Sequence, residues 1–255
     1  MSTQSRRERR AGRLAASRSG HRSREVSTPQ GRSRSPIAVL SFVGLVIGTA
    51  IVAVLIISGQ GPRPGGDTSL IRPAIAIPAA LVQGRSLGDQ DAPVEIEIWS
   101  DFQCPACGMF TRTIEPLLRS AYVEEGTVRL RYRDLAFLGA ESVDAAVAAR
   151  VADDIGPGFW RFHDLLFANQ AGENQGSFSR ERLGAMAESL GMDRATFLDR
   201  LDDPALRAAV REETVSGTAA GIDSTPTLVI DGVAYAGSPA WERLAQLIDT
   251  LVASS

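Results

Sequence analysis

The stretch Val94-Glu-Ile-Glu-Ile-Trp-Ser-Asp-Phe-Gln-Cys-Pro-Ala-Cys107 decides how this chain folds. Val94 to Trp99 is typical of a strand, and a helix is predicted to follow from Cys104 to Tyr122. Cys107 lies on the apolar face of that helix, with Phe110, Ile114, Leu117, Leu118 and Ala121. The chain has only these two cysteines, so they form a single C-x-x-C pair.

Three interpretations of the cysteine pair compete. As a structural disulfide it would contribute little, because closing a four-residue loop is worth only about 2 kcal/mol, against about 4.7 kcal/mol for a 100-residue loop. A zinc site needs about four ligands, and the two histidines, His21 and His163, are the remaining soft candidates. His21 precedes a predicted membrane segment, which separates it from the cysteines. A redox pair needs only two sulfur atoms and is the favoured interpretation.

The neighbouring residues predict different roles for the two thiols. Pro105 suits the first position of a helix, which makes Cys104 the N-cap. Its thiolate can then accept hydrogen bonds from unpartnered N–H groups and gain from the helix dipole, which lowers its pKa. We therefore expect Cys104 to be the exposed, accessible nucleophile and Cys107 the shielded, resolving thiol. Their cycle would pass through a mixed disulfide between Cys104 and a substrate cysteine.

The rest of the domain predicts a mixed α/β fold. A second strand is expected over 128–135, a helical region over roughly 141–220, and a final amphipathic helix over 241–252. Between the last two lies a predicted hairpin, with strands over 227–230 and 233–235 joined by an Asp-Gly turn. Helix boundaries are indicated by possible N-caps and a glycine stop: Ser179, Asp193, Asp203 before Pro204, and Gly191.

Three segments together resemble the DsbA-like branch of the thioredoxin superfamily. They are the run Trp99 to Cys107, the helical segment Gly158-Phe-Trp-Arg-Phe-His-Asp-Leu-Leu-Phe167 and the run Gly221-Ile-Asp-Ser-Thr-Pro-Thr-Leu-Val-Ile-Asp-Gly232. The resemblance covers about residues 85–255. It implies a thioredoxin fold with an inserted helical subdomain at about 139–220, within a domain expected at 89–255. It also implies a cis peptide between Thr225 and Pro226 facing the cysteines, where the backbone before the proline pairs with substrate.

The sequence departs from the family pattern at two positions. Many relatives carry a buried acid six residues before the first cysteine, and here that position is Ile98. Glu97 is expected on the opposite face of the strand, so we assign it no catalytic role; proton transfer would use water or another carboxylate. The strongest oxidants of the family have histidine between the cysteines, and Ala106 in its place predicts a milder oxidant.

Other conspicuous residues are expected to be structural. His163 is interpreted as a packed or surface histidine, and Asp101 as a turn residue close enough to Cys104 to influence that thiol. A group of large apolar side chains is expected to pack a helix into the core rather than form a peptide groove: Phe159, Trp160, Phe162, Leu165, Leu166 and Phe167.

The N-terminal part is unlike the rest in charge. Residues 1–36 contain ten arginines and two glutamates, a balance of +8, so the remaining 17 basic and 28 acidic residues give −11. This segment lacks apolar periodicity and is expected to be a disordered basic arm on the cytoplasmic side. It would contact anionic lipid, with nucleic-acid binding a weak alternative.

Residues 37–58 form an uncharged apolar run and are expected to be a transmembrane anchor. A helix of this length spans about 33 Å, enough for a hydrocarbon core of about 30 Å. A cleaved signal peptide is the main alternative, but the run is long and no A-x-A site follows it. The arginines place residues 1–36 in the cytoplasm and the catalytic domain outside. Residues 59–88, rich in glycine and proline, are expected to be a linker.

These features predict a single-pass, membrane-anchored, extracytoplasmic thiol–disulfide oxidoreductase whose redox group is the Cys104–Cys107 disulfide, with no other cofactor and no metal. Its expected substrates are secreted or surface polypeptides with cysteines, in a compartment where disulfides persist. Family resemblance implies regeneration by a membrane quinone-linked oxidase of the DsbB or vitamin K epoxide reductase-like (VKOR-like) type; no nucleic acid is expected. Two alternatives are a disulfide reductase or isomerase, and a chaperone-like binding module on a thioredoxin scaffold.

Overall fold

The computed structural model describes residues 69–73, 77–156 and 158–255. The basic arm (1–36), the anchor (37–58) and residues 59–68 and 74–76 of the expected linker lie outside these residues. Within the described part, no helix is both long enough and apolar enough to cross a membrane. The predicted anchor therefore stays a prediction from the sequence.

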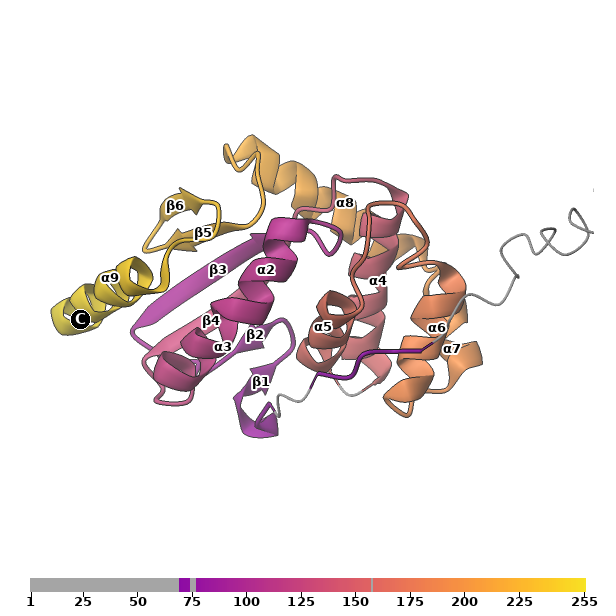
Figure 1. Ribbon diagram of the computed structural model, residues 1–255, viewed down its shortest axis with the longest axis horizontal. Helices are drawn as coiled ribbons and strands as arrows, with labels where there is room; N and C mark the ends of the chain where they lie inside the picture. Colours follow the sequence, from indigo (N-terminus) through magenta and orange to yellow (C-terminus); the bar gives the residue numbers. More distant parts are fainter. Residues whose placement is uncertain (1–68, 74–76, 157) are drawn as a thin grey trace, which may run out of the picture. The chain divides into compact units, whose positions relative to one another are not determined.

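A mixed sheet forms the centre of the domain (Figure 1). Its strands lie in the order β1-β2-β4-β3-β5-β6. The pair β3–β4 is parallel and the other neighbours are antiparallel. The strands are β1 (Val82–Gln83), β2 (Ser86–Leu87), β3 (Val94–Ser100), β4 (Val128–Asp134), β5 (Thr227–Ile230) and β6 (Val233–Ala236).

Helices α4 to α8 lie in the chain between β4 and β5, where the helical insertion is expected, and the other helices precede or follow this interval. The bounds of all the described helices are given next. They are α2 (Pro105–Thr113), α3 (Glu115–Leu118), a π-helical turn (Arg119–Val123), α4 (Ala140–Ile155), α5 (Phe159–Ala168), α6 (Arg180–Ser189), α7 (Arg194–Arg200), α8 (Pro204–Ala219) and α9 (Trp241–Ser254); a short 3₁₀ turn (Ala79–Leu81) precedes β1. The α/β class and the helical insertion predicted from the sequence are confirmed.

The two faces of β3 contact different helices. Side chains alternate along a strand, so Ile96 and Ile98 share one apolar cluster with Leu244 and Ile248 of α9. On the opposite face, Trp99 packs in a smaller cluster. The aromatic side chains of α5 are almost completely buried, which confirms that this helix packs into the core.

The helix after the cysteines is not continuous, contrary to the expectation of one helix from Cys104 to Tyr122. It ends at Thr113, resumes at Glu115 and closes as a π-helical turn. Pro116 explains the break, because it has no N–H to donate to the carbonyl of Arg112 and its ring would clash in a continuous helix. Sequence periodicity alone had masked this break.

The expected linker boundary at residue 88 was wrong. Residues 82–83 and 86–87 are strands, and Ser86 and Leu87 pair with Arg131 and Leu130 of β4. Two-residue strands are too short to show an alternating pattern, so only their pairing reveals them.

The local signals for turns and caps are largely confirmed. Asp231 and Gly232 have positive φ values of 50° and 75°, as an Asp-Gly hairpin turn requires. The carboxylates of Asp193 and Asp203 cap α7 and α8 through hydrogen bonds to backbone N–H groups. Ser179 precedes α6, but its side chain makes no capping bond.

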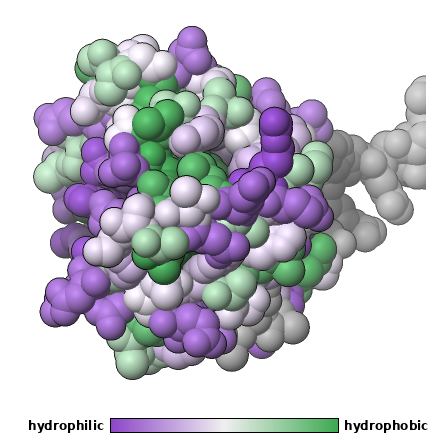
Figure 2. All heavy atoms as spheres, turned by 90° about the vertical axis from the view of Figure 1, so that its left-hand side faces the viewer, coloured by the Kyte–Doolittle hydropathy of each residue, from purple (hydrophilic) through white to green (hydrophobic). Residues whose placement is uncertain are grey.

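Helix α9 and the β5–β6 hairpin form one side of the domain that the structure describes, and Figure 2 faces this side. Its surface is mostly polar, with a narrow apolar strip. Strand β6 is the sheet edge and all four of its residues are exposed, including Val233 and Tyr235.

A close approach of α8 to β3 gives a stability prediction. Gly217 is buried, and a Cβ there would lie 2.4 Å from Cζ3 of Trp99 and 3.0 Å from Cδ1 of Leu135. Although Gly→Ala in a helix commonly stabilises by about 0.5–1 kcal/mol, Gly217→Ala should here destabilise by about 1–3 kcal/mol through overpacking. Urea denaturation would measure this change. Ser216→Ala, at the exposed neighbouring position, serves as the control; equal stability of the two variants would contradict the close contact.

Candidate active site

Cys104 is the N-cap of α2, as predicted. Its backbone is extended, Pro105 follows at the first helical position, and its sulfur accepts a hydrogen bond from the Cys107 N–H at 3.4 Å. The Cys107 thiol is the strongest influence, and with the N–H groups of Cys107 and Ala106 and the Thr225 side chain it lowers the pKa of Cys104 to about 6, against the opposing effect of burial. Cys104 is therefore largely a thiolate at neutral pH.

Cys107 lies in a contrasting environment. Its side chain is fully buried, and burial, followed by the thiol and charge of Cys104, raises the pKa of Cys107 well above its ordinary value. The Ser100 hydroxyl and the Asp101 N–H act in the opposite direction but do not reverse this shift. The pair thus combines one ionised and one protonated thiol, the asymmetry that the sequence predicts.

The loop before β5 lies against Cys104. The Thr225–Pro226 peptide is cis, as the family resemblance implies, and the Cys104 sulfur lies 3.4 Å from the Thr225 carbonyl oxygen. The sequence predicts an exposed Cys104, but this residue is only 7% exposed, so it is far more covered than expected. The reason is tertiary: a segment 121 residues away packs over the sulfur.

Asp101 does more than the turn residue expected from the sequence. Its buried carboxylate accepts hydrogen bonds from the N–H groups of Gln103, Phe137 and Leu138 and from the Ser142 hydroxyl, at 2.7–3.1 Å. Burial nevertheless raises the pKa of Asp101 above its ordinary value. The four bonds tie the loop before Cys104 to the start of α4.

Two further polar residues hold this loop and were missed by sequence reasoning. The Gln170 side-chain amide donates to the carbonyl oxygens of Phe102 and Cys104, both at 2.8 Å. The side chain of Gln103 accepts from the Asn174 N–H at 2.5 Å. Gln170 and Asn174 belong to the loop after α5, and nothing in the local sequence indicates that they reach the cysteines.

His163 is a buried core residue on α5 and lies in an ion cluster. Its Nδ1 is 2.9 Å from Asp164, whose carboxylate also receives two hydrogen bonds of 2.8 Å from Arg119. Arg119 bonds Glu115 as well. Burial opposes ionisation, but the bonds from His163 and Arg119 lower the pKa of Asp164 to about 2. The spacing of His163, Glu115 and Asp164 could suit a cation, and the Arg119 guanidinium takes that role here.

The residues before the cysteines lie as the strand alternation predicts. Ile98 is buried on the face of β3 that carries the main core. Glu97 points to the other face, where it accepts from the Trp99 indole at 3.2 Å and lies 3.6 Å from Arg133. Neither residue therefore supplies a carboxylate to Cys107.

Comparison with known proteins agrees with this geometry. Residues 81–250 match the family model described as thioredoxin. The probable disulfide bond formation protein D of Bacillus anthracis is 27% identical over 168 residues, covering 65% of this chain and 76% of the relative. The oxidised form of BdbD from Bacillus subtilis superposes with a TM-score of 0.62 at 25% identity, covering 66% of this chain and 92% of that chain. The alpha-DsbA1 protein of Wolbachia pipientis shares the fold, with a TM-score of 0.61 at 17% identity.

The pKa of Cys104 predicts its reactivity with pH. Because the folded value is lowered to about 6, alkylation of the reduced protein by iodoacetamide should reach half its maximal rate near pH 6, and not near the ordinary value of about 8.5. Cys107→Ala removes the largest contribution and should move this midpoint upward. Mass spectrometry after timed quenching would follow both proteins, with Cys104→Ser as the blank. A wild-type midpoint above pH 8 would contradict the stabilised thiolate.

Proposed function

Because the chain belongs to the thioredoxin family, as a DsbA-like protein disulfide oxidoreductase, we propose that it forms disulfides in proteins outside the cytoplasm. The observation that carries this direction is the contrast between Cys104, whose pKa is lowered to about 6, and the fully buried Cys107, whose pKa is raised. A stabilised thiolate favours the reduced form of the enzyme, so its disulfide is readily given to a substrate. The names of the Bacillus relatives, disulfide bond formation proteins, agree with this direction.

The proposed reaction exchanges one disulfide for another. A substrate thiolate attacks the Cys104 sulfur of the Cys104–Cys107 disulfide, and Cys107 leaves with the electron pair of the broken bond and takes up a proton. A second substrate thiolate then attacks the substrate sulfur of the mixed disulfide and displaces the Cys104 thiolate. The substrate loses two electrons and the enzyme gains them. Ala106 between the cysteines supports a milder oxidant than relatives with histidine there.

Thr225 and Pro226 form the proposed substrate-binding loop. The Thr225 carbonyl lies 3.4 Å from the Cys104 sulfur, so a peptide that pairs with this backbone would bring its own cysteine close to the nucleophile. Backbone pairing recognises any extended chain, since it does not depend on side-chain identity. This supports a broad range of unfolded or partly folded polypeptides as substrates.

The proposed location is the outer face of a membrane. The support is the apolar run at 37–58 and the ten arginines before it, which are expected to remain in the cytoplasm. The partner proposed for reoxidation is a membrane quinone-linked oxidase of the DsbB or VKOR-like type, held in the same bilayer as the anchor. Substrates would then be secreted or surface proteins.

Refolding of a reduced protein with several disulfides tests the direction of the reaction. The oxidised chain should accelerate disulfide gain, and Cys104→Ser should abolish the effect because it removes the attacked sulfur. A glutathione redox titration should give a potential well above that of thioredoxin, about −270 mV. A potential near that value would favour the reductase alternative. If Cys104→Ser accelerates refolding as much as the original chain does, the result would favour the chaperone-like module.

Protease digestion of intact cells tests the proposed topology. Protease outside the cells should digest the domain that carries Cys104 and spare a tag placed in the arginine segment at 1–36, because the arginines are retained on the cytoplasmic side. Immunoblotting of both ends gives the readout, with a cytoplasmic protein as the control for cell integrity. Loss of the N-terminal tag with survival of the catalytic domain would reverse the topology.

A further inference from the structure

A residue of the helical insertion binds the backbone on both sides of the loop's last step into α2. Gln170 follows α5 in the chain, and its side-chain nitrogen donates to the carbonyl oxygens of Phe102 and Cys104, both at 2.8 Å. An amide NH₂ group carries two N–H donors, so a single nitrogen can serve both carbonyls. Gln170 therefore fixes the direction of the backbone immediately before and after Gln103 and Cys104.

The Cys104 carbonyl also belongs to the helix. It accepts the N–H of Gly108 at 3.1 Å, which is the first backbone hydrogen bond of α2. The direction of this carbonyl is set by the ψ angle of Cys104, which is 120°. The same angle decides how the sulfur of this N-cap residue faces the free N–H groups of the first turn. By holding the carbonyl, Gln170 holds the sulfur and the first turn in their relative positions.

Gly108 leaves the space that Gln170 occupies. Glycine is unfavourable inside a helix because it loses much backbone freedom on folding, yet α2 has one near its start. A Cβ at this position would lie 3.0 Å from Cδ of Gln170 and closer still to its Oε1. Alanine at 108 and Gln170 in its present place therefore exclude each other. The atoms in the way are the far end of a flexible side chain, so alanine would displace the amide without breaking the fold.

The charged side chains near the first turn have partners of their own. Asp101, in the loop before α2, accepts four hydrogen bonds through its carboxylate. Arg112, one turn further along α2, donates from Nη1 to the Phe167 carbonyl at 2.9 Å. Gln170 itself is neutral. Its replacement by another neutral side chain thus alters the position of the first turn and adds no charge near Cys104.

We propose that Gln170 is a positioning residue that keeps the first turn of α2 aimed at the Cys104 sulfur, and that residue 108 is glycine to admit it. The Cys107 thiol contributes most to the lowered pKa of Cys104, and the N–H groups of Cys107 and Ala106 in this turn add to it. If the turn shifts, these groups move away from the sulfur and the thiolate loses stability. The redox consequence of this inference rests on the proposed function.

Alkylation of the reduced full chain by iodoacetamide across the pH range measures the effect. Gln170→Met keeps the length of the side chain and removes both donors. The midpoint for Cys104 should then rise from about 6 by about 0.5–1 pH unit, the value of about one hydrogen bond. Gly108→Ala, which displaces the amide, should raise it by a similar amount. Gln246→Met, at an exposed position of α9, is the matched control and should keep the wild-type midpoint.

A double variant tests whether the two positions act together. Gln170→Ala loses both hydrogen bonds and empties the space above residue 108, so adding Gly108→Ala should raise the midpoint no further. Additive rises would overturn the proposed fit between Gly108 and Gln170. A wild-type midpoint in Gln170→Met would overturn the positioning role, even if urea denaturation showed a less stable protein, because a purely structural residue changes stability and leaves the pKa of the thiol in place.

The redox potential gives a second readout. A rise of 0.5–1 unit in the pKa of Cys104 makes the reduced form about three- to fivefold less favoured at pH 7, so the potential of Gln170→Met should be lower by about 15–20 mV. An unchanged or higher potential in a glutathione titration would count against the inference. Failure of the wild type to oxidise a substrate would contradict the proposed function instead, because the alkylation midpoints are measured without substrate.

Discussion

The site depends on one interaction, the contact between the Cys104 sulfur and the first turn of α2. Thiol and N–H groups there favour the thiolate and lower its pKa to about 6. Since Cys107 lies three residues further along the same helix, the geometry that exposes one sulfur to these donors buries the other. A single helix start therefore creates two thiols of opposite protonation. Hydrogen bonds of Asp101 and Gln170 to the backbone hold this start in place.

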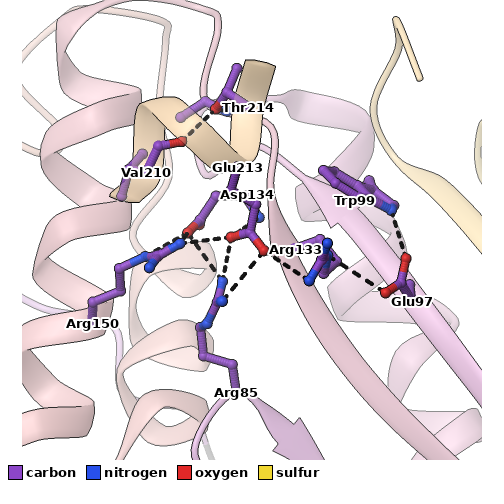
Figure 3. Close-up of polar contacts among 10 residues, drawn as sticks. Arg85, Glu97, Trp99, Arg133, Asp134, Arg150, Val210, Glu213 and Thr214 are labelled. Carbon is purple, nitrogen blue, oxygen red and sulfur yellow. Dashed lines mark hydrogen bonds and ion pairs between the residues drawn. The ribbon is translucent and has the colours of Figure 1, made fainter. Parts of the chain in front are cut away.

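Buried polar groups set the relation between the sheet and the helical insertion. Asp134 at the end of β4 bonds Arg150 of α4, and Glu213 of α8 bonds the same arginine (Figure 3). Such charges are costly to bury unless they are paired, so the helices must lie where their partners are.

Sequence reasoning succeeded where the signal is local. The strands at 94–100 and 128–134 follow from apolar alternation, the hairpin from Asp231-Gly232, and the N-cap role of Cys104 from Pro105. It failed where pairing or packing decides, and at one local signal that another pattern concealed. The strands at 82–83 and 86–87 exist only because β4 pairs with the second of them. The break in the helix at 114 follows from Pro116, a local signal that the apolar periodicity of the segment concealed.

The amino-acid sequence alone determined the reaction type, because a lone C-x-x-C with proline after the first cysteine specifies a helix start that favours a thiolate at that cysteine. It also determined the family, through three short motifs, each of which is continuous in the chain. Only the tertiary structure decided how far Cys104 is covered, which polar groups hold its loop, and what lies beside Cys107. Those neighbours come from Thr225, Gln170 and Tyr132, residues distant in sequence. Their contacts arise from chain packing, which no local pattern encodes.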